Sequence, residues 1–362
     1  MPAEWESHAA TWLAWPHYKL DWPGKFEPIP WVYAEIIRYL SRNERVEVIV
    51  NDAASEKVAS RTLKLAHASN DNVSFHRWPT DRVWTRDSGC AFVASYGKSQ
   101  SQNPHPVSTK NVETRMGHPT KLSAVKWRFN AWAKYPNWKR DEKIGSMMAE
   151  FASAKEIRPE FKGNRVVLEG GSIEVNGSGT LVTTEECLLS RVQQRNPGMK
   201  KRDYEKIFTE YLGARNVIWL GSGIVGDDTH GHVDDITRFV SPDTVVTCVD
   251  ADPTSQNYEV LRENIRRLRD ATTEDGKPLA TIDLPMPAPL YFEGRRLPAS
   301  YANFYIGNEI VLVPVFNDPN DRIALDIFAD IFPDRDVVGI YCGDLIWGFG
   351  AIHCMTQQQP EV

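Results

Sequence analysis

A unit of two short strands, a helix and a third strand recurs along this chain, and such a repeat restricts the possible folds more than any single motif does. The clearest copy begins at 172–183, where a strand, an Asn-Gly turn and a second strand follow one another. Similar hairpins are predicted at 236–248 and 302–313, and a fourth is predicted to begin at Cys90. The chain is therefore predicted to be an α/β protein built from one module used several times.

Each of the three complete hairpins is followed by helical apolar spacing and then by a short run typical of a strand. The predicted helices are 203–212, 258–268 and 321–332, and the strands that follow them are 217–220, 281–284 and 337–341. An N-terminal helix at 31–40 likewise precedes a strand at 46–50. The alternative interpretation is an ordinary α/β protein whose hairpins are alike by chance.

The length of 362 residues by itself suggests two domains, because an average domain has about 150 residues. The repeat favours one closed domain instead, spanning residues 1–362. The longest nearly uncharged apolar run, 310–316, is far shorter than the roughly 20 residues that span a bilayer, and the amino terminus lacks a basic stretch followed by an apolar one. We therefore expect a cytoplasmic location and no membrane partner.

Residues 96–140 carry the weakest pattern and are predicted to be a loop or lid insertion within that domain. Within this range Trp127, Trp132 and Trp138 alternate with basic residues, which would also be typical of a surface that stacks on nucleic-acid bases. The formal net charge of -6 disfavours a nucleic-acid partner, so we prefer a covering insertion.

Acidic residues stand immediately before the predicted hairpins: Asp87, Glu169 and Asp234. If the modules are related by rotation about an axis, equivalent positions meet around it, so these carboxylates would gather in one pocket. The cation that fits them best is a planar guanidinium, and the ring of Trp84 could cover one of its faces. Taken singly, each residue also has a structural interpretation: Asp87 could pair with Arg86, and Glu169 could cap a turn.

The segment 230–235 allows two functions. If it is a strand, His230, His232 and Asp234 point to the same side, as the ligands of a hydrolase metal would. In the same geometry, His232 could instead carry protons beside a substrate-binding carboxylate of Asp234. Spacing alone does not separate the two histidines.

The best nucleophile candidate is Cys354, which follows two glycines and His353 in a short loop. Five cysteines are an odd number, and none forms a CxxC pair, so a disulfide framework is not expected. Cys187, Cys248 and Cys342 lie in apolar runs and are interpreted as small buried residues.

Several motifs, in order from residue 1 to the end, carry a resemblance to a known family. They are Ala10-Thr-Trp-Leu-Ala-Trp-Pro16, Trp84-Thr-Arg-Asp87, Phe129-Asn-Ala-Trp132, Leu168-Glu-Gly-Gly171, Gly231-His-Val-Asp234 and Ile352-His-Cys354. The chain resembles the agmatine deiminase family, which includes the bacterial type of peptidylarginine deiminase. The resemblance implies the pentein fold, a five-module ββαβ propeller with pseudo-fivefold symmetry.

The same resemblance implies roles for individual residues. It makes Cys354 the nucleophile, His232 the general acid and base, Asp87 and Asp234 the carboxylates that bind guanidinium, and Glu169 the acid that supports His232. It implies no metal and no organic cofactor. The chain departs from the usual pattern at 347–351, before the Ile-His-Cys sequence, and at Cys90 after the Arg-Asp motif.

The function expected on this basis is hydrolysis of agmatine to N-carbamoylputrescine and ammonia through a thiouronium on Cys354. Three alternatives remain: action on free or peptidyl arginine or transfer of the amidino group, a metal-dependent hydrolase using His230, His232 and Asp234, and a catalytically silent guanidinium-binding protein. The expected partner is a small cationic guanidino compound, and a homo-oligomer is possible. Asp21, Asp227 and Asp228 are candidates for binding the distal amine.

Overall fold

The computed structural model describes residues 1–96 and 119–362 and contains the predicted module in full. In one copy, two antiparallel strands are followed by helical turns, and a third strand returns parallel to the second. Its elements are β9 (Ile173–Val175), β10 (Thr180–Thr184), α5 (Glu185–Leu189), α6 (Lys201–Ile207), a π-helical turn (Phe208–Leu212) and β11 (Asn216–Leu220). The helical segment stops at Gly213, whose φ of 75° lies in the left-handed region that glycine adopts freely.

Three further modules have the same pairing, and the hairpins predicted from the sequence are confirmed. The first consists of β4 (Ala91–Tyr96), β5 (Pro119–Val125), α4 (Asp141–Phe151) and β6 (Lys155–Ile157). The second consists of β12 (Thr237–Ser241), β13 (Thr244–Val249), α7 (Tyr258–Arg269) and β14 (Ala280–Pro285). The third consists of β17 (Tyr305–Gly307), β18 (Ile310–Val315), α8 (Asn320–Ile331) and β19 (Asp336–Tyr341).

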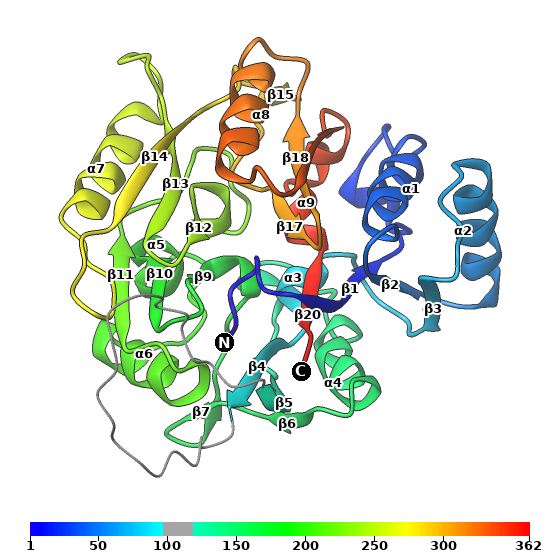
Figure 1. Ribbon diagram of the computed structural model, residues 1–362, viewed down its shortest axis with the longest axis horizontal. Coiled ribbons are helices and arrows are strands. Elements are labelled where there is room, and N and C mark those ends of the chain that lie inside the picture. Colours follow the sequence, from blue (N-terminus) through cyan, green and yellow to red (C-terminus); the bar gives the residue numbers. More distant parts are fainter. Residues whose placement is uncertain (97–118) are drawn as a thin grey trace, which may run out of the picture.

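The fifth module is assembled from the two ends of the chain. Strand β20 (Gln357–Pro360) is antiparallel to β1 (His8–Ala14), which is parallel to β2 (Arg45–Val50) beyond helix α1 (Ile29–Leu40). This sheet is extended by α2 (Ala53–Leu65) and β3 (Val73–Arg77). Figure 1 shows the five modules around a centre close to which both termini lie. The expected five-module ββαβ propeller is therefore confirmed, and pairing of the two ends closes it.

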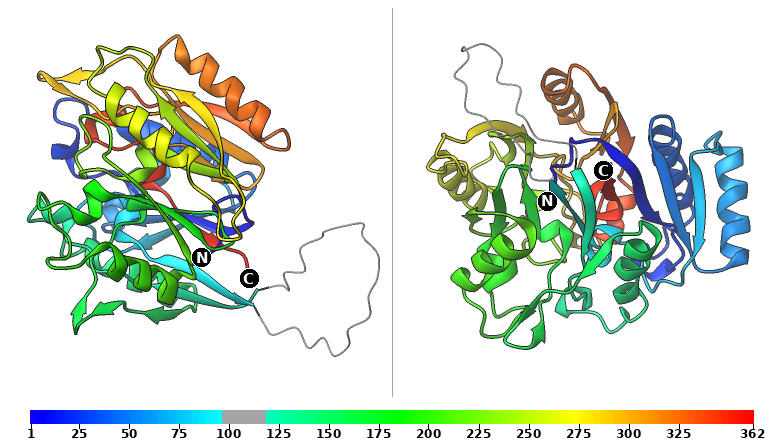
Figure 2. Two further views of the ribbon diagram at one scale, coloured as in Figure 1. Left: turned by 90° about the vertical axis from the view of Figure 1, so that its left-hand side faces the viewer. Right: turned by 60° about the horizontal axis from the view of Figure 1, so that its bottom comes forward.

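Short elements connect the modules: α3 (Thr85–Ser88), β7 (Glu160–Phe161), β8 (Asn164–Arg165), β15 (Tyr291–Phe292), β16 (Arg295–Arg296) and α9 (Ile352–Met355). The views in Figure 2 show the sheets grouped around the interior and the longer helices on the outside. Within residues 1–96 and 119–362, none of the helices has the length and apolarity needed to cross a membrane.

The predicted insertion at 96–140 is wrong for part of that range. Strand β5 begins at Pro119 and pairs with β4, so these residues are the second strand of a module. Trp127 and Trp132 are buried, which excludes the base-stacking surface considered for this segment. Residues 97–118 lie outside the described part of the chain. The interpretation of the rest of 96–140, apart from strand β5, as a lid stays a prediction.

The centre of the propeller is polar and holds a buried network of charges. The carboxylate of Glu4 accepts hydrogen bonds from Arg238 at 2.8 Å and from Arg86 at 3.0 Å. Arg238 also donates to Glu174 at 2.9 Å and to the carbonyl of Phe304 at 2.7 Å. Burial alone would raise the pKa of Glu4, but Arg238 and its other cationic neighbours hold that pKa well below its ordinary value. Glu4 therefore links three modules as an ionised group.

Replacing Arg238 by methionine is expected to lower the free energy of unfolding by about 3–5 kcal/mol, because two buried carboxylates lose their guanidinium partner. Urea unfolding followed by circular dichroism measures this. Arg266→Met is the control, since Arg266 forms only exposed pairs on α7, and we expect an unchanged midpoint. Equal midpoints for both variants would show that the central network does not stabilise the fold.

Candidate active site

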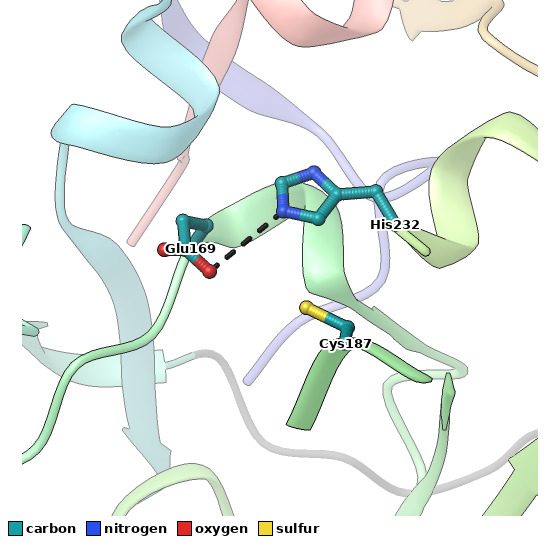
Figure 3. Close-up of side chains that lie close together, drawn as sticks. All are labelled: Glu169, Cys187 and His232. Carbon is teal, nitrogen blue, oxygen red and sulfur yellow. Dashed lines mark ion pairs between the residues drawn. The ribbon is translucent and has the colours of Figure 1, made fainter. Parts of the chain in front are cut away.

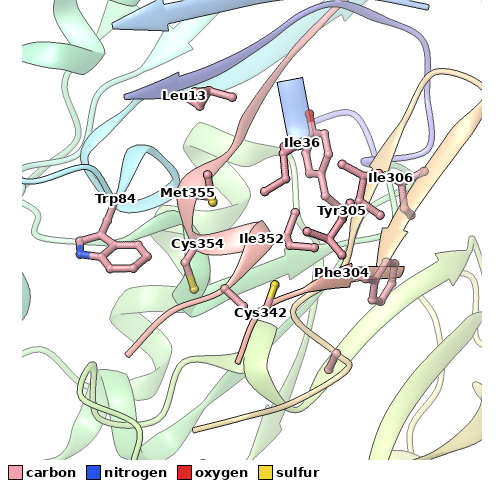
Figure 4. Packing of buried hydrophobic residues seen from close by; sticks show 14 of the residues in the cluster. Leu13, Ile36, Trp84, Phe304, Tyr305, Ile306, Cys342, Ile352, Cys354 and Met355 are labelled. Atoms are coloured by element: carbon pink, nitrogen blue, oxygen red, sulfur yellow. The ribbon is translucent and has the colours of Figure 1, made fainter. Parts of the chain in front are cut away.

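Cys354 lies on the short helical turn α9, and Figure 4 shows its side chain near the ring of Trp84. Its Sγ atom is 3.1 Å from the side-chain amide of Asn303 and 3.8 Å from Oδ2 of Asp234. A Cβ atom at Gly350 would be 2.6 Å from the ring of Trp84 and 3.1 Å from the Cβ of Cys354. Glycine at 350 therefore allows the loop to lie against both Trp84 and the thiol, as the two glycines before Cys354 suggested.

His232 and Asp234 face the same buried space from the turn before β12. His232 precedes a 3₁₀ helix, Val233–Asp235, so the segment is not the strand that the sequence suggested. Nδ1 of His232 is nevertheless 3.9 Å from Oδ1 of Asp234. Both ring nitrogens of His232 and Oδ1 of Asp234 are buried without a hydrogen-bond partner in the structure. Buried polar atoms normally have partners, so these three atoms point to a polar ligand at this position.

Glu169 faces the Nε2 atom of the His232 imidazole (Figure 3). Its Oε2 is 3.7 Å from Nε2 of His232, and both of its oxygens accept hydrogen bonds from the Nε of Arg195, at 3.1 and 3.3 Å. The thiol of Cys187 lies within 4.8 Å of ligand-capable atoms of Glu169 and His232. Glu169 is the N-cap residue of the 3₁₀ turn Gly170–Ser172, but its side chain makes no cap hydrogen bond and is bound by Arg195 instead.

Asp87 completes the set of carboxylates. Its Oδ1 accepts a hydrogen bond from the backbone N–H of Gly171 at 3.0 Å, and its Oδ2 accepts one from the indole of Trp132 at 2.9 Å. Oδ1 is also 3.9 Å from Nδ1 of His232. The proposed pairing of Asp87 with the preceding arginine is wrong, because the guanidinium of Arg86 bonds instead to Glu4 and to Gln358 and His353.

Gly171 makes this convergence possible. A Cβ atom at this position would lie 2.6 Å from Nδ1 of His232 and 2.9 Å from Oδ2 of Asp234. Any other residue at 171 would push the imidazole and the carboxylate away from Asp87. The structure thus brings Cys354, His232, Glu169, Asp87 and Asp234 together, and the repeat of acidic residues had predicted the meeting of the three carboxylates.

The carboxylates set the protonation of the groups between them. Burial alone would lower the pKa of His232, but Asp87, Cys187 and Glu169 raise it well above its ordinary value, which favours an imidazolium. Burial also raises the pKa of the Cys354 thiol well above its ordinary value, and Asp234 and its acidic neighbours add to this rise. Both directions favour the protonated imidazole of His232 and the protonated thiol of Cys354.

A bound cation is expected to lower the pKa of Cys354, because positive charge beside the carboxylates favours the thiolate. Ultraviolet thiolate absorbance, taken as the difference from Cys354→Ala, measures that pKa with and without a small alkylguanidinium salt. Sodium chloride at the same ionic strength is the control. The expectation would be contradicted if the pKa of Cys354 in the alkylguanidinium salt were equal to or higher than its pKa in sodium chloride.

The role of metal ligand considered for His230 is wrong. This residue has a φ of 67° in the turn before His232, and its ring nitrogens lie 3.1 Å from the Ser190 hydroxyl and 3.7 Å from a Glu186 carboxylate oxygen. The two side-chain groups in the described chain that could hold a metal are Glu169–Cys187–His232 and Asp234–Asp235–Cys354, and neither includes His230. The metal cluster of His230, His232 and Asp234 is therefore not assembled.

Three residues of the site, His353, Asn303 and Arg195, were not singled out from the sequence. Nδ1 and Nε2 of His353 lie 2.7 Å from Asp234 and 2.9 Å from Glu4, so His353 joins the site to the centre of the propeller. Asn303 bonds both Cys354 and Asp235, and Arg195 holds Glu169. Only His353, next to the predicted nucleophile, carried a sequence signal that could have identified it.

Cys354 and Asp87 line a cavity of about 120 Å³. Trp84, Trp132, Asp21 and Asp228 line the same cavity. Asp227 is different, since its carboxylate accepts hydrogen bonds from the backbone N–H groups of 229, 231 and 232. Of the three candidates for the distal amine, two therefore line the cavity and one shapes the turn.

Comparison with known proteins places the chain in a family. The family model for Porphyromonas-type peptidyl-arginine deiminase matches residues 1–360. The agmatine deiminase of Ectopseudomonas mendocina is 32% identical over 383 residues, which cover 99% of this chain and 95% of that protein.

Among solved structures, the agmatine deiminase of Enterococcus faecalis superposes with a TM-score of 0.85 at 29% identity and covers 100% of this chain and 95% of that one. A C. jejuni agmatine deiminase with substrate bound gives a TM-score of 0.82 at 27% identity, over 100% of this chain and 96% of that one. The similarity extends over the whole fold, including every module that contributes to the site. The chain therefore belongs to the Porphyromonas-type peptidyl-arginine deiminase family.

Proposed function

We propose that this protein hydrolyses the guanidinium group of agmatine, giving N-carbamoylputrescine and ammonia, with Cys354 as the nucleophile. The observation that carries the proposal is the set of buried, unpartnered atoms on His232 and Asp234 beside the Cys354 thiol. A guanidinium supplies N–H donors for carboxylates and a carbon for the thiolate to attack. Relatives of similar length, named agmatine deiminases, support agmatine as the substrate.

The carboxylates of Asp87 and Asp234 hold the guanidinium in place and neutralise its charge. Substrate binding lowers the pKa of the thiol, and the thiol proton leaves. The Cys354 thiolate then forms a bond to the guanidinium carbon, and the imidazolium of His232 gives a proton to one terminal nitrogen. The bond from carbon to that nitrogen breaks, ammonia departs, and a thiouronium remains on Cys354.

His232 is neutral after this step and takes a proton from water as the water oxygen bonds to the same carbon. The bond from carbon to Sγ breaks and returns the thiolate, and the hydroxyl proton of the departing product passes to solvent. Glu169, held by Arg195, keeps the imidazole in position through both steps. No step requires an oxidant or reductant.

Ammonia release from agmatine, arginine and an arginyl peptide, compared side by side, tests this proposal. We expect agmatine to give the largest kcat/KM and to yield N-carbamoylputrescine, with no loss of rate in the presence of a chelator. Turnover of the peptide alone would contradict agmatine as the substrate. Loss of activity on chelation that added metal restores would favour a metal-dependent hydrolase, and binding of agmatine without ammonia release would favour a silent binding protein.

The proposed partner is therefore a small cationic guanidino compound. A homo-oligomeric state and a cytoplasmic location stay predictions. Size-exclusion chromatography with light scattering measures the first, and fractionation of the native cells measures the second.

A further inference from the structure

We propose that Phe349 is a specificity-determining residue: its ring narrows the mouth of the cavity, so that a guanidinium on an unbranched alkyl chain enters and one carried on a peptide backbone does not. The inference rests on the proposed function and deepens it. It concerns the one bulky residue between two glycines in the loop before Cys354.

The backbone at Phe349 is strained. Its φ of 65° and ψ of 21° lie in the left-handed region, which bulky residues rarely adopt. The neighbouring glycines are needed for another reason: a Cβ at Gly348 would lie 2.8 Å from the indole nitrogen of Trp22, and one at Gly350 would lie 2.6 Å from the ring of Trp84. A glycine at 349 would be free of strain, so contacts of the Phe349 ring must offset the cost of this conformation.

One such contact is with a cation. The guanidinium of Arg295 lies over the Phe349 ring, 4.1 Å from its centroid, at the distance of a cation–π interaction. Arg295 also donates a hydrogen bond to Asp228 at 2.5 Å. Because β15 and β16 form a hairpin, the same element brings Phe292 against Trp347, with 3.9 Å between ring centroids. The hairpin and the 347–349 loop thus form one aromatic wall.

Asp228 joins this wall to Lys134 and Tyr135. It accepts hydrogen bonds from Lys134 at 2.6 Å and from the Tyr135 hydroxyl at 2.5 Å, as well as from Arg295. Tyr135, Asp228 and Phe349 line the same cavity as Cys354. At about 120 Å³ this cavity is smaller than the roughly 300–1,000 Å³ that hold drug-sized ligands. We expect a methylene chain to fit between these walls, and a peptide backbone to require displacement of Arg295 from Phe349 and Asp228.

The test compares Phe349→Asn with Phe349→Tyr. Asparagine tolerates the left-handed backbone but lacks the ring, and tyrosine keeps the ring, so the pair separates the ring from the loop conformation. The readout is the inhibition constant of N-acetylarginine amide against agmatine turnover. In Phe349→Asn we expect the inhibition constant to fall by about tenfold, a size typical of one altered pocket contact. The KM for agmatine should change less. In Phe349→Tyr the inhibition constant should stay near the wild-type value.

Arg295→Gln provides a second variant outside the strained loop, and it decides the outcome if Phe349→Asn does not fold. Removing the guanidinium releases the Phe349 ring, so the inhibition constant of N-acetylarginine amide should again fall. An unchanged constant in every folded variant, or an equal fall in Phe349→Tyr, overturns the role of Phe349. A wild-type protein that does not turn over agmatine would instead contradict the proposed function.

Discussion

Replacing Cys354 by alanine is expected to lower kcat for agmatine by about 10⁴-fold or more, while the protein stays folded and still binds agmatine. The loss is large because the guanidinium stays bound while its carbon loses the thiolate that attacks it. Ammonia release measures kcat, and isothermal calorimetry measures agmatine binding. The raised pKa keeps the Cys354 thiol uncharged, and alanine is also uncharged. The substitution therefore does not change the net charge of the site.

Cys342→Ala is the matched control for this experiment. Cys342 is also fully buried, but it follows β19 and does not line the cavity that Cys354 reaches. We expect this variant to keep kcat within a few-fold of the wild type. Comparable losses in both variants would mean that the Cys354 effect reflects packing, and undiminished turnover in Cys354→Ala would exclude it as the nucleophile.

Replacing His232 by glutamine is expected to lower kcat by about 10²–10⁴-fold, the range typical of a lost general acid and base. Glutamine keeps an amide in the space of the imidazole but cannot carry a proton from the thiouronium step to the water step. The measurement is kcat for ammonia release across a range of pH. A pH-independent loss of less than about tenfold would show that His232 does not transfer the proton.

His230→Gln is the corresponding control, because this nearby histidine contacts Ser190 and Glu186 rather than the site. We expect its kcat to stay within a few-fold of the wild type. If His230→Gln and His232→Gln were equally impaired, and added metal restored either of them, the metal-dependent alternative would replace the thiol mechanism.

The module could be predicted from the sequence because each copy is local. In 172–183 a turn signal separates two short strands, and the helix that follows has an apolar face, so short-range pairing determines the structure. The closing module has no such signal. Its β20 strand contains Gln357, Gln358 and Gln359, and it pairs with β1 from the other end of the chain. Pairing at this sequence separation depends on the closed ring and cannot be deduced from the composition of either strand.

The site was predictable in the part that follows from the repeat. Asp87, Glu169 and Asp234 meet because they occupy equivalent places in modules arranged around one centre. The interpretation of 230–235 as a strand failed because Gly231, with a φ of 92°, turns the chain between the two histidines. A strand period cannot be applied across such a turn.

Residues that act through another residue were not predictable. Arg195 holds Glu169, Asn303 bonds the Cys354 thiol, and Glu4 reaches His353, each from a different part of the chain. Their side chains are ordinary polar residues in sequence, and only the packing of modules against one another brings them to the site. For Phe349 the sequence showed only that 347–351 departs from the family pattern, because its left-handed backbone is a property of the folded loop.

The measurement that tests the mechanism most directly is intact-protein mass spectrometry after rapid acid quenching during agmatine turnover. We expect a transient species heavier than the protein by agmatine minus ammonia, located by peptide mapping on the peptide that contains Cys354 and absent from Cys354→Ala. An adduct on another residue, or turnover at the full rate with no adduct at any quench time, would contradict covalent catalysis by Cys354.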